Sequence, residues 1–420
     1  MVKRWLAILV AFQACVARPL PPSIPDKVTE LVAALQEGEL ERALEVAAWL
    51  RPRVTYDAAA ALWSSVVAEL LWRDDEAVNC QLAAARLTAQ SQPDHLQQRG
   101  RLGDLLFQAG RWGEAREPLR ASATAGLDAE RRAAFAVLAG QLPFQRRPTG
   151  PLLTEQRVFA GDVPEFLCGS GDRQRPFAID TGTSMTTLAA ALAAELQVHD
   201  RQRAGTAVDG TGRSLDVEVG VMDRFHVGEV DLGSVPVLVV ADESLRLRDL
   251  FGGPERAPRG VLGLDLIAAF RLTLDPDRGS VVLELPRGLP EGDSVQCVRA
   301  EGRCLVPITI EGARLWFVLD TGASHSSLTT SGLLALPGGE ERAVPSFRRV
   351  RTVGGSLVAV REVRDLVLRS SAARFRSVTL PVVPRSAGEL FPVHGVVGID
   401  LLSRCRVTLD RGRARLQVVR

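Results

Sequence analysis

Two short segments of this chain each place an aspartate behind an apolar stretch, in nearly the same local sequence. The first is Phe177-Ala-Ile-Asp-Thr-Gly-Thr-Ser184 and the second is Phe317-Val-Leu-Asp-Thr-Gly-Ala-Ser324, so Asp180 and Asp320 occupy equivalent positions. Two carboxylates brought face to face cannot both ionise, and a pair that shares one proton offers a general acid and a general base. The two segments therefore predict proton-transfer chemistry at a single site.

A second motif shows that more than the aspartate is duplicated. Residues 260–275 return as residues 395–410, with 9 of 16 positions identical. The offset is 140 residues for the two aspartates and 135 residues for Gly263 and Gly398, so both motifs recur in the same order at nearly the same spacing. A repeat of this length indicates a duplicated structural unit.

Other paired residues in the two copies suggest structural roles. Asp265 and Asp400 each precede an expected short helix, which favours N-capping over catalysis for both. Between the two motifs of each copy lie the pairs Asp209-Gly210 and Gly354-Gly355, which are typical of hairpin turns. We therefore expect a β-hairpin in each copy at these residues.

Copy by copy, these pieces resemble the retropepsin-like aspartic proteases of bacteria. Each copy has Asp-Thr-Gly-x-Ser after an apolar strand, then a hairpin pair, then an apolar-apolar-Gly strand. The resemblance implies an all-β, two-lobed acid-protease domain in which the hairpins are flaps over the substrate. It also implies that Gly263 and Gly398 let their strands pass close to the catalytic loops. The only tyrosine of the chain is Tyr56, so the flap tyrosine of pepsin-type enzymes is absent, which favours the retropepsin-like branch.

The resemblance assigns catalysis to Asp180 and Asp320, without a cofactor. One ionised carboxylate would take a proton from a water molecule that attacks a peptide carbonyl, while the other carboxyl donates a proton to the carbonyl oxygen. A hydroxyl three residues after the aspartate can lower its pKa, and since only the first copy has one, we expect Asp180 to ionise more readily. The residues of the two supporting loops are Thr181, Gly182, Thr183, Ser184, Thr321, Gly322, Ala323 and Ser324. Because one chain carries both copies, we expect a monomer to be sufficient for cleavage of a peptide or protein substrate.

Residues 26–141 carry a helical pattern rich in Ala, Leu, Glu and Arg. Similar turn segments recur near residues 41, 75 and 113, and Gly38 and Gly110 mark two of the turns. The pattern resembles tetratricopeptide repeats, which stack because no single unit buries its apolar face alone. That resemblance implies a groove for a protein partner, and a helical spacer or an inhibitory pro-segment is the alternative interpretation.

Composition shifts divide the chain into domains. Residues 142–151 are rich in Pro, Gly and Arg and form the expected linker, after which short β-branched segments predict strands. A second linker is expected at residues 286–293, between lobe 1 at 152–285 and lobe 2 at 294–420. The predicted fold class is a helical-repeat domain followed by an all-β, two-lobed domain.

The N-terminus predicts export. Lys3 and Arg4 precede an apolar run and small residues, so residues 1–17 have the features of a signal peptide. The segment ending at Cys15 resembles a bacterial lipobox, which leaves lipidation as an alternative to plain cleavage. We therefore expect a periplasmic or extracellular protein, either free or anchored to the envelope by lipid. With 51 basic and 50 acidic residues, the positive and negative charges of the chain nearly cancel and give no electrostatic attraction for nucleic acid. We therefore expect no nucleic-acid partner.

Cysteines and histidines complete the candidate residues. Export permits disulfides, and Cys297 and Cys304 flank an expected tight hairpin, which makes them the preferred pair. Cys405 stands at an apolar position of the repeat and is expected to be a buried thiol. No set of cysteines and histidines has metal-ligand spacing, so we expect no metal. His325 follows the second catalytic loop, and we expect it to be a solvated side chain in a turn or at the start of a helix.

Two classes of function fit these observations. The first is an exported aspartic endopeptidase with a helical-repeat domain. The second is a catalytically silent scaffold in which the repeats recruit a partner and the lobes only grip peptide. In a variant of the first class, the helical domain masks the cleft until cleavage at Arg146-Arg147. Retention of Asp, Thr and Gly in both copies favours the enzyme.

Overall fold

The structure is a computed structural model that describes residues 23–89, 94–124, 129–143, 153–157, 163–210, 212–245, 259–284, 286, 289, 294–352, 355–384, 390–410 and 414–419. The expected signal segment with Cys15, most of both predicted linkers and the flap candidate Gly354 lie outside the described residues. No helix in the described part of the chain is long and apolar enough to cross a membrane.

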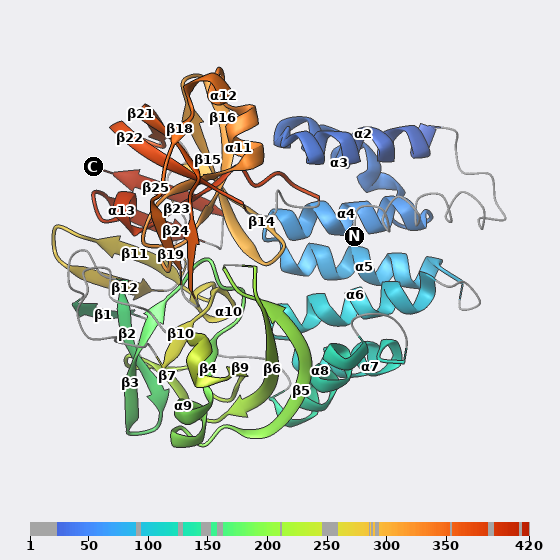
Figure 1. The fold of residues 1–420 in the computed structure, drawn as a ribbon. Coiled ribbons are helices and arrows are strands. Elements are labelled where there is room, and N and C mark those ends of the chain that lie inside the picture. Colours follow the sequence, from blue (N-terminus) through green and yellow to red (C-terminus); the bar gives the residue numbers. More distant parts are fainter. Residues whose placement is uncertain are drawn as a thin grey trace. The chain divides into compact units, whose positions relative to one another are not determined.

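An α-helical unit forms the first part of the chain (Figure 1). Consecutive helices pack against each other, so each covers an apolar face of the next. Gly38 follows α2 (Ser23–Glu37) and Gly110 follows α6 (Asp94–Gln108), with positive φ angles of 72° and 71°, as the sequence predicted for these turns. The helices are α2 (Ser23–Glu37), α3 (Leu40–Leu50), α4 (Ala58–Leu70), α5 (Asp74–Leu87), α6 (Asp94–Gln108), α7 (Trp112–Ser122) and α8 (Ala129–Gln141), with a 3₁₀ turn η1 (Arg51–Arg53).

Lobe 1 of the β unit is a nine-stranded sheet in the order β5-β6-β9-β4-β10-β3-β2-β7-β8. Its strands are short and rich in valine, and the inward positions are almost fully buried. The elements are β2 (Glu165–Ser170), β3 (Arg173–Ile179), β4 (Thr187–Ala189), α9 (Ala190–Glu195), β5 (His199–Val208), β6 (Ser214–Met222), β7 (Phe225–Val227), β8 (Val230–Asp231), β9 (Val235–Val240), η2 (Asp242–Leu245), β10 (Gly260–Leu262) and α10 (Leu264–Ile267).

Lobe 2 repeats this plan in an eight-stranded sheet, β14-β15-β16-β23-β17-β22-β21-β18, with a separate two-stranded sheet β19-β20. The elements are β14 (Val298–Ala300), β15 (Arg303–Ile310), β16 (Ala313–Leu319), β17 (Ser327–Thr329), α11 (Thr330–Ala335), α12 (Gly339–Arg342), β18 (Val344–Pro345), β19 (Arg349–Thr352), β20 (Gly355–Val358), β21 (Arg361–Ser370), β22 (Ala373–Val383), β23 (Gly395–Val397) and α13 (Ile399–Leu402).

The duplication is visible in the strand register. In lobe 1, β10 runs parallel to β3 with Val261 opposite Ala178, and in lobe 2, β23 runs parallel to β16 with Val396 opposite Val318. The glycine that starts each of these strands, Gly260 or Gly395, packs so closely on a phenylalanine ring that a Cβ would collide with it. The predicted fold class, helices followed by a two-lobed β region, is therefore confirmed.

A six-stranded sheet, β1-β12-β11-β24-β25-β13, joins the two lobes. At its centre, β11 of lobe 1 pairs antiparallel with β24 of lobe 2, and Thr273 lies opposite Thr408. Their hydroxyl oxygens are 3.2 Å apart. The strands are β1 (Leu153–Arg157), β11 (Arg271–Asp275), β12 (Ser280–Glu284), β13 (Val295–Gln296), β24 (Arg406–Asp410) and β25 (Arg415–Val419). This continuous ladder fixes one lobe against the other.

The predicted disulfide between Cys297 and Cys304 is wrong, because both residues are free, buried thiols. The hairpin register places Arg299 opposite Cys304, while Cys297 lies before the first paired residue of β14. Burial and the neighbouring Cys304 thiol raise the pKa of Cys297. Cys405 is a buried free thiol, as predicted.

Candidate active site

Asp180 and Asp320 lie at the ends of β3 and β16, and the fold brings them together. Both are buried, with 4% and 7% of their surface exposed. A Cβ added to Gly182 would lie 2.5 Å from Cγ of Asp320, and one added to Gly322 would lie 2.5 Å from Oδ2 of Asp180. Each carboxylate therefore occupies the space that a side chain on the opposite loop would need, and only glycine fits there.

Two threonines lock the loops together. The hydroxyl of Thr181 donates to the carbonyl of Leu319 at 2.7 Å, and the hydroxyl of Thr321 donates to the carbonyl of Ile179 at 2.6 Å. Each backbone N–H of the two threonines donates to the hydroxyl of the other at 3.1 Å. These reciprocal bonds are buried and tie the two loops to each other.

The loop residue three positions after each aspartate differs between the two lobes. Each aspartate accepts a bond from the N–H of the glycine two residues on, at 2.8 Å from Gly182 and 3.0 Å from Gly322. In addition, the Thr183 hydroxyl donates to Oδ2 of Asp180 at 2.9 Å, whereas the equivalent residue in lobe 2 is an alanine. The hydroxyl therefore stabilises the ionised form of Asp180.

The environment of Asp180 and Asp320 favours a state in which the two carboxyl groups share one proton. Burial and the charge of Asp320 raise the pKa of Asp180 to about 7, against the bonds from Thr183 and Gly182, which lower it. Because the two carboxyl groups interact directly, the proton released near this pH belongs to the pair. At weakly acidic pH the pair therefore holds one proton and one negative charge, which is the state that acid–base catalysis requires.

The closing strands support the loops by close backbone approach. A Cβ on Gly263 would collide with the backbone at Met185 and Thr186, and one on Gly398 would lie 2.7 Å from the carbonyl oxygen of Ala323. The positions predicted for Gly263 and Gly398, beside the catalytic loops, are therefore confirmed.

Asp265 and Asp400 are not N-caps, which corrects the sequence-based assignment. The N-cap positions of α10 and α13 are Gly263 and Gly398, which have no side chain. Instead, Oδ1 of Asp265 accepts the N–H and the hydroxyl of Thr186 at 2.8 and 2.9 Å. The same oxygen of Asp400 accepts both groups of Ser326 at 2.7 Å.

These two aspartates therefore tie the far end of each catalytic loop to the helix behind it. In the sequence, a hydroxyl residue follows each catalytic aspartate by six positions, and Asp265 and Asp400 each follow the closing-strand glycine by two positions. This paired recurrence was the sequence signal for the hydrogen bonds.

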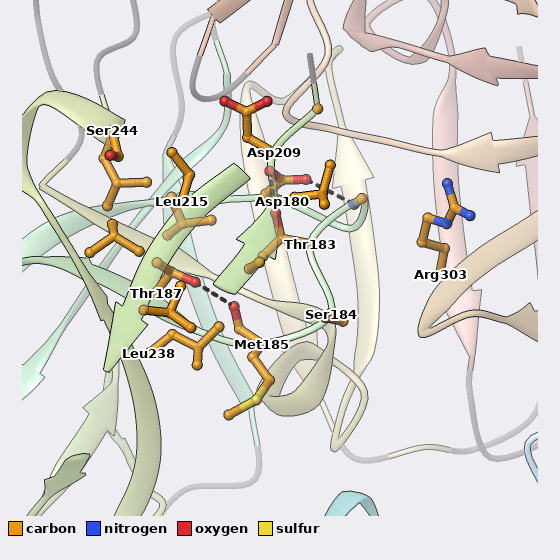
Figure 2. Close-up of a pocket in the computed structure, with 18 of the residues that line it drawn as sticks. Asp180, Thr183, Ser184, Met185, Thr187, Asp209, Leu215, Leu238, Ser244 and Arg303 are labelled. Carbon is orange, nitrogen blue, oxygen red and sulfur yellow. Dashed lines mark hydrogen bonds between the residues drawn. The ribbon is translucent and has the colours of Figure 1, made fainter. Parts of the chain in front are cut away.

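A hairpin stands over the dyad at one of the two predicted places. β5 and β6 are antiparallel, and the turn between them is closed by a bond from the N–H of Asp209 to the carbonyl of Arg213 at 3.0 Å. Asp209 and Gly210 both line the cavity that contains the dyad. Figure 2 shows Asp209 beside Asp180. In lobe 2, Gly355 begins β20 of the predicted second hairpin, but the described residues of that hairpin do not line this cavity.

The cavity has a volume of about 580 Å³ and draws most of its walls from lobe 1. Lobe 2 adds the ion pair of Glu301 and Arg303, and Figure 2 shows Arg303 on the opposite side of the view from the apolar wall. The lining residues that the sequence did not reveal are Met185, Thr187, Ala207, Val208, Gly212, Leu215, Val217, Leu238, Val240, Ser244, Leu245, Val261, Glu301, Arg303, Val318 and Pro384. Most of the apolar residues among them come from strands, in which the alternation of apolar residues is the same as in any buried strand.

Ser184, Ser324 and His325 complete the predicted loop residues. Ser184 is exposed and lines the cavity, whereas Ser324 is buried and its Oγ lies 2.8 Å from Nδ1 of His325. His325 lies in a bend and is half-buried. In the described part of the chain, no cluster of three or more His, Cys, Asp or Glu side chains is arranged to hold a metal ion.

Comparison with known proteins agrees with the two-lobed organisation. Residues 168–266 and 306–401 each match the aspartyl protease family, once per lobe and across both catalytic loops. A search of curated proteins found no match.

Solved structures similar to this chain include an aspartic proteinase from Irpex lacteus, at 12% identity and a TM-score of 0.38, with 63% of this chain and 97% of that chain covered. Basic 7S globulin from soybean is similar at 14% identity and a TM-score of 0.36, with 64% and 95% covered. Conglutin gamma from lupine seeds is similar at 11% identity and a TM-score of 0.36, with the same two shares covered.

Proposed function

We propose that this chain is an aspartic endopeptidase whose dyad, Asp180 and Asp320, forms within one chain. The observation that carries the proposal is that two buried carboxylates, one from each lobe, face each other. They lie on two loops that are held together by the hydroxyl groups of two threonines. The match of each lobe to the aspartyl protease family supports it.

The chemistry follows from the protonation state of the pair. The ionised carboxylate takes a proton from a water molecule that attacks the peptide carbonyl, and the protonated carboxyl donates to the carbonyl oxygen. The Thr183 hydroxyl favours Asp180 as the base, which leaves Asp320 as the acid. The hairpin residues Asp209 and Gly210 line the cavity, and we propose that this hairpin excludes bulk water while substrate is bound.

Digestion of a peptide library tests the proposal. The wild-type chain is expected to cleave, whereas the variants Asp180→Asn and Asp320→Asn, checked for unchanged thermal unfolding, should lose activity by at least about a thousandfold because an amide cannot exchange the proton. Pepstatin serves as an active-site control. Full activity in either well-folded variant would refute the dyad, and binding of peptides without cleavage by the wild type would favour the scaffold function instead.

The cellular location of the protein and the partner of its helical unit are also proposed here. We propose export to the periplasm or the cell exterior, and a peptide or protein partner for the helical unit, on the sequence features of residues 1–17 and 26–141. Cell fractionation with an N-terminal sequence of the mature chain tests the first proposal. Affinity capture by the helical unit within the intact chain, compared with a chain whose exposed helical faces are substituted, tests the second.

A further inference from the structure

We propose that His199 is a positioning residue for the peptidase site, because in its protonated form it clamps the base of the β5–β6 hairpin, whose other end lines the dyad cavity. The effect on cleavage rests on the proposed peptidase function, whereas the clamp itself can be measured without catalysis. The clamp should hold the hairpin most firmly at weakly acidic pH.

Both ring nitrogens of His199 face carboxylates. Nδ1 lies 2.8 Å from Oδ2 of Asp200, and Nε2 lies 2.9 Å from Oδ2 of Asp223. An ionised carboxylate only accepts hydrogen bonds, so both nitrogens must carry a proton for both bonds to form. A neutral imidazole would turn a lone pair toward one of the carboxylates and lose that bond. The geometry therefore favours the imidazolium.

The two carboxylates belong to opposite strands of the hairpin and have fixed positions. Asp200 is the second residue of β5, and Asp223 directly follows β6. The Ser234 hydroxyl donates to Oδ1 of Asp223 at 2.6 Å, and the Ser170 hydroxyl donates to the carbonyl of Asp223 at 2.6 Å. Asp200 has a φ of 49°, which is uncommon outside glycine. His199 thus joins the start of one strand to the end of the other.

Cross-strand ion pairs continue from this clamp to the hairpin tip. They are Arg201–Glu218, Arg203–Asp216 at 3.6 Å and Arg213–Asp209 at 3.3 Å. Leu215 and Val217, which alternate along β6 with the paired acids Asp216 and Glu218, line the dyad cavity together with Asp209. The pairs between the strands therefore lie on one face of the hairpin, and the opposite face forms part of the cavity wall.

The counterpart hairpin of lobe 2, β19–β20, cannot form such a ladder between its strands. Residues 343–360 contain three arginines and no acidic residue. In the strand register, Arg349 lies opposite Val358. The clamp is therefore a feature of lobe 1, whose hairpin lines the cavity.

The charges around His199 set the pH range of the clamp. The hydrogen bond to Asp200 raises the pKa of His199 above its ordinary value of 6.5, burial opposes this, and Asp223 raises the pKa further. Arg224, the next residue, extends its guanidinium toward Gly171. Because the folded pKa is raised, the clamp is complete below about pH 6.5 and is lost as the pH rises through the folded value. The hairpin is thus held over the range in which the dyad keeps its shared proton.

Hydrogen exchange of the backbone amides of β5 and β6 in the full chain tests the clamp. Between about pH 5.5 and about pH 8.5, the protection of the wild-type hairpin, corrected for intrinsic exchange, should fall roughly fivefold, or about 1 kcal/mol, as expected for exposed ion pairs. His199→Gln should show the lower protection at both pH values. His199→Arg, which stays cationic, should show the higher protection at both.

A second histidine of lobe 1 provides the matched control. His226 lies in β7, outside the hairpin, with its Nε2 3.9 Å from Asp231. His226→Gln should leave the protection of β5 and β6 and its pH dependence unchanged. Equal protection of the wild-type hairpin at both pH values would overturn the inference, as would a His199→Gln hairpin that is as protected as the wild type at acidic pH.

Peptide cleavage shows whether the clamp serves the site. At weakly acidic pH, His199→Gln should raise KM for a fluorogenic peptide more than it lowers kcat, and His199→Arg should restore KM. An unchanged KM in a well-folded His199→Gln chain would overturn the positioning role. The expected exchange pattern without any cleavage supports the clamp and refutes only the peptidase proposal, whereas cleavage without that pattern overturns the clamp alone.

Discussion

Removal of one hydroxyl tests the division of labour within the dyad. Thr183 donates to Asp180 at 2.9 Å in a partly buried site, and Ala323 stands at the equivalent place in lobe 2. A hydrogen bond to a charged group contributes about 1.5–3 kcal/mol. Since one pKa unit corresponds to about 1.36 kcal/mol, Thr183→Ala should raise the pKa at which the first carboxylate ionises by roughly one to two units.

The pH dependence of kcat/KM shows which carboxylate carries the charge. If Asp180 is ionised in the active pair, the hydroxyl stabilises both the active form and the form that has lost the shared proton. In that case only the acidic limb of the profile moves upward, and the alkaline limb, expected near pH 7 from the raised pKa, stays in place.

The assay is the cleavage of one fluorogenic peptide between pH 3 and about 9, with thermal unfolding recorded at each pH. Ala323→Ser is the matched control, because a new hydroxyl beside Asp320 should lower the alkaline limb and leave the acidic limb in place. A Thr183→Ala profile that coincides with that of the wild type would refute the assignment of the hydroxyl. Movement of the alkaline limb alone would show that Asp320 is the ionised partner.

Three further predictions follow from the contacts of the β unit. Asp265→Asn should keep measurable peptidase activity while Asp265→Ala lowers the free energy of unfolding by about 2–3 kcal/mol in urea, because the amide oxygen still accepts from Thr186; loss of activity in the well-folded Asn variant would instead make Asp265 a catalytic group. Gly182→Ala should abolish cleavage, since its Cβ would lie 2.5 Å from the opposite carboxyl carbon, and wild-type rates in that variant would contradict the geometry. Burial lowers the pKa of His394 to about 4, and its Nδ1 accepts the N–H of Trp316 at 2.9 Å. Because this folded pKa lies below the unfolded value, a contribution of about 3 kcal/mol to the free energy of unfolding is present above pH 6.5 and is lost as the pH falls toward 4. The free energy of unfolding in urea should therefore fall with pH across this range, and His394→Gln should remove that dependence.

Features carried by local sequence were predicted correctly. Gly38 and Gly110 end helices, Asp209 and Gly210 form a hairpin turn, and the two Asp-Thr-Gly loops follow apolar strands. Each of these depends on backbone conformation and burial within a few residues, which residue type and periodicity report directly.

Predictions that needed side-chain partners were less successful. Asp265 stands at the start of a helix, where an aspartate ordinarily caps, yet it bonds Thr186 from 79 residues away. The thiols of Cys297 and Cys304 are neighbours, as their positions around a hairpin predict, but both are free. The partner of Asp265 is decided by the packing of the closing strand against the loop of the other motif, which the neighbours of Asp265 in sequence do not report.

The sequence by itself determined that this chain contains two copies of one lobe, that each copy carries a carboxylate on a glycine turn, and that the copies differ at Thr183 and Ala323. Only the tertiary structure decided that the carboxylates meet in one buried site and that lobe 1 supplies most of the cavity wall. The physical reason is that residue type fixes the chemistry a side chain can perform, whereas pKa, burial and hydrogen-bond partners are set by groups brought in from about 140 residues away by sheet pairing and packing.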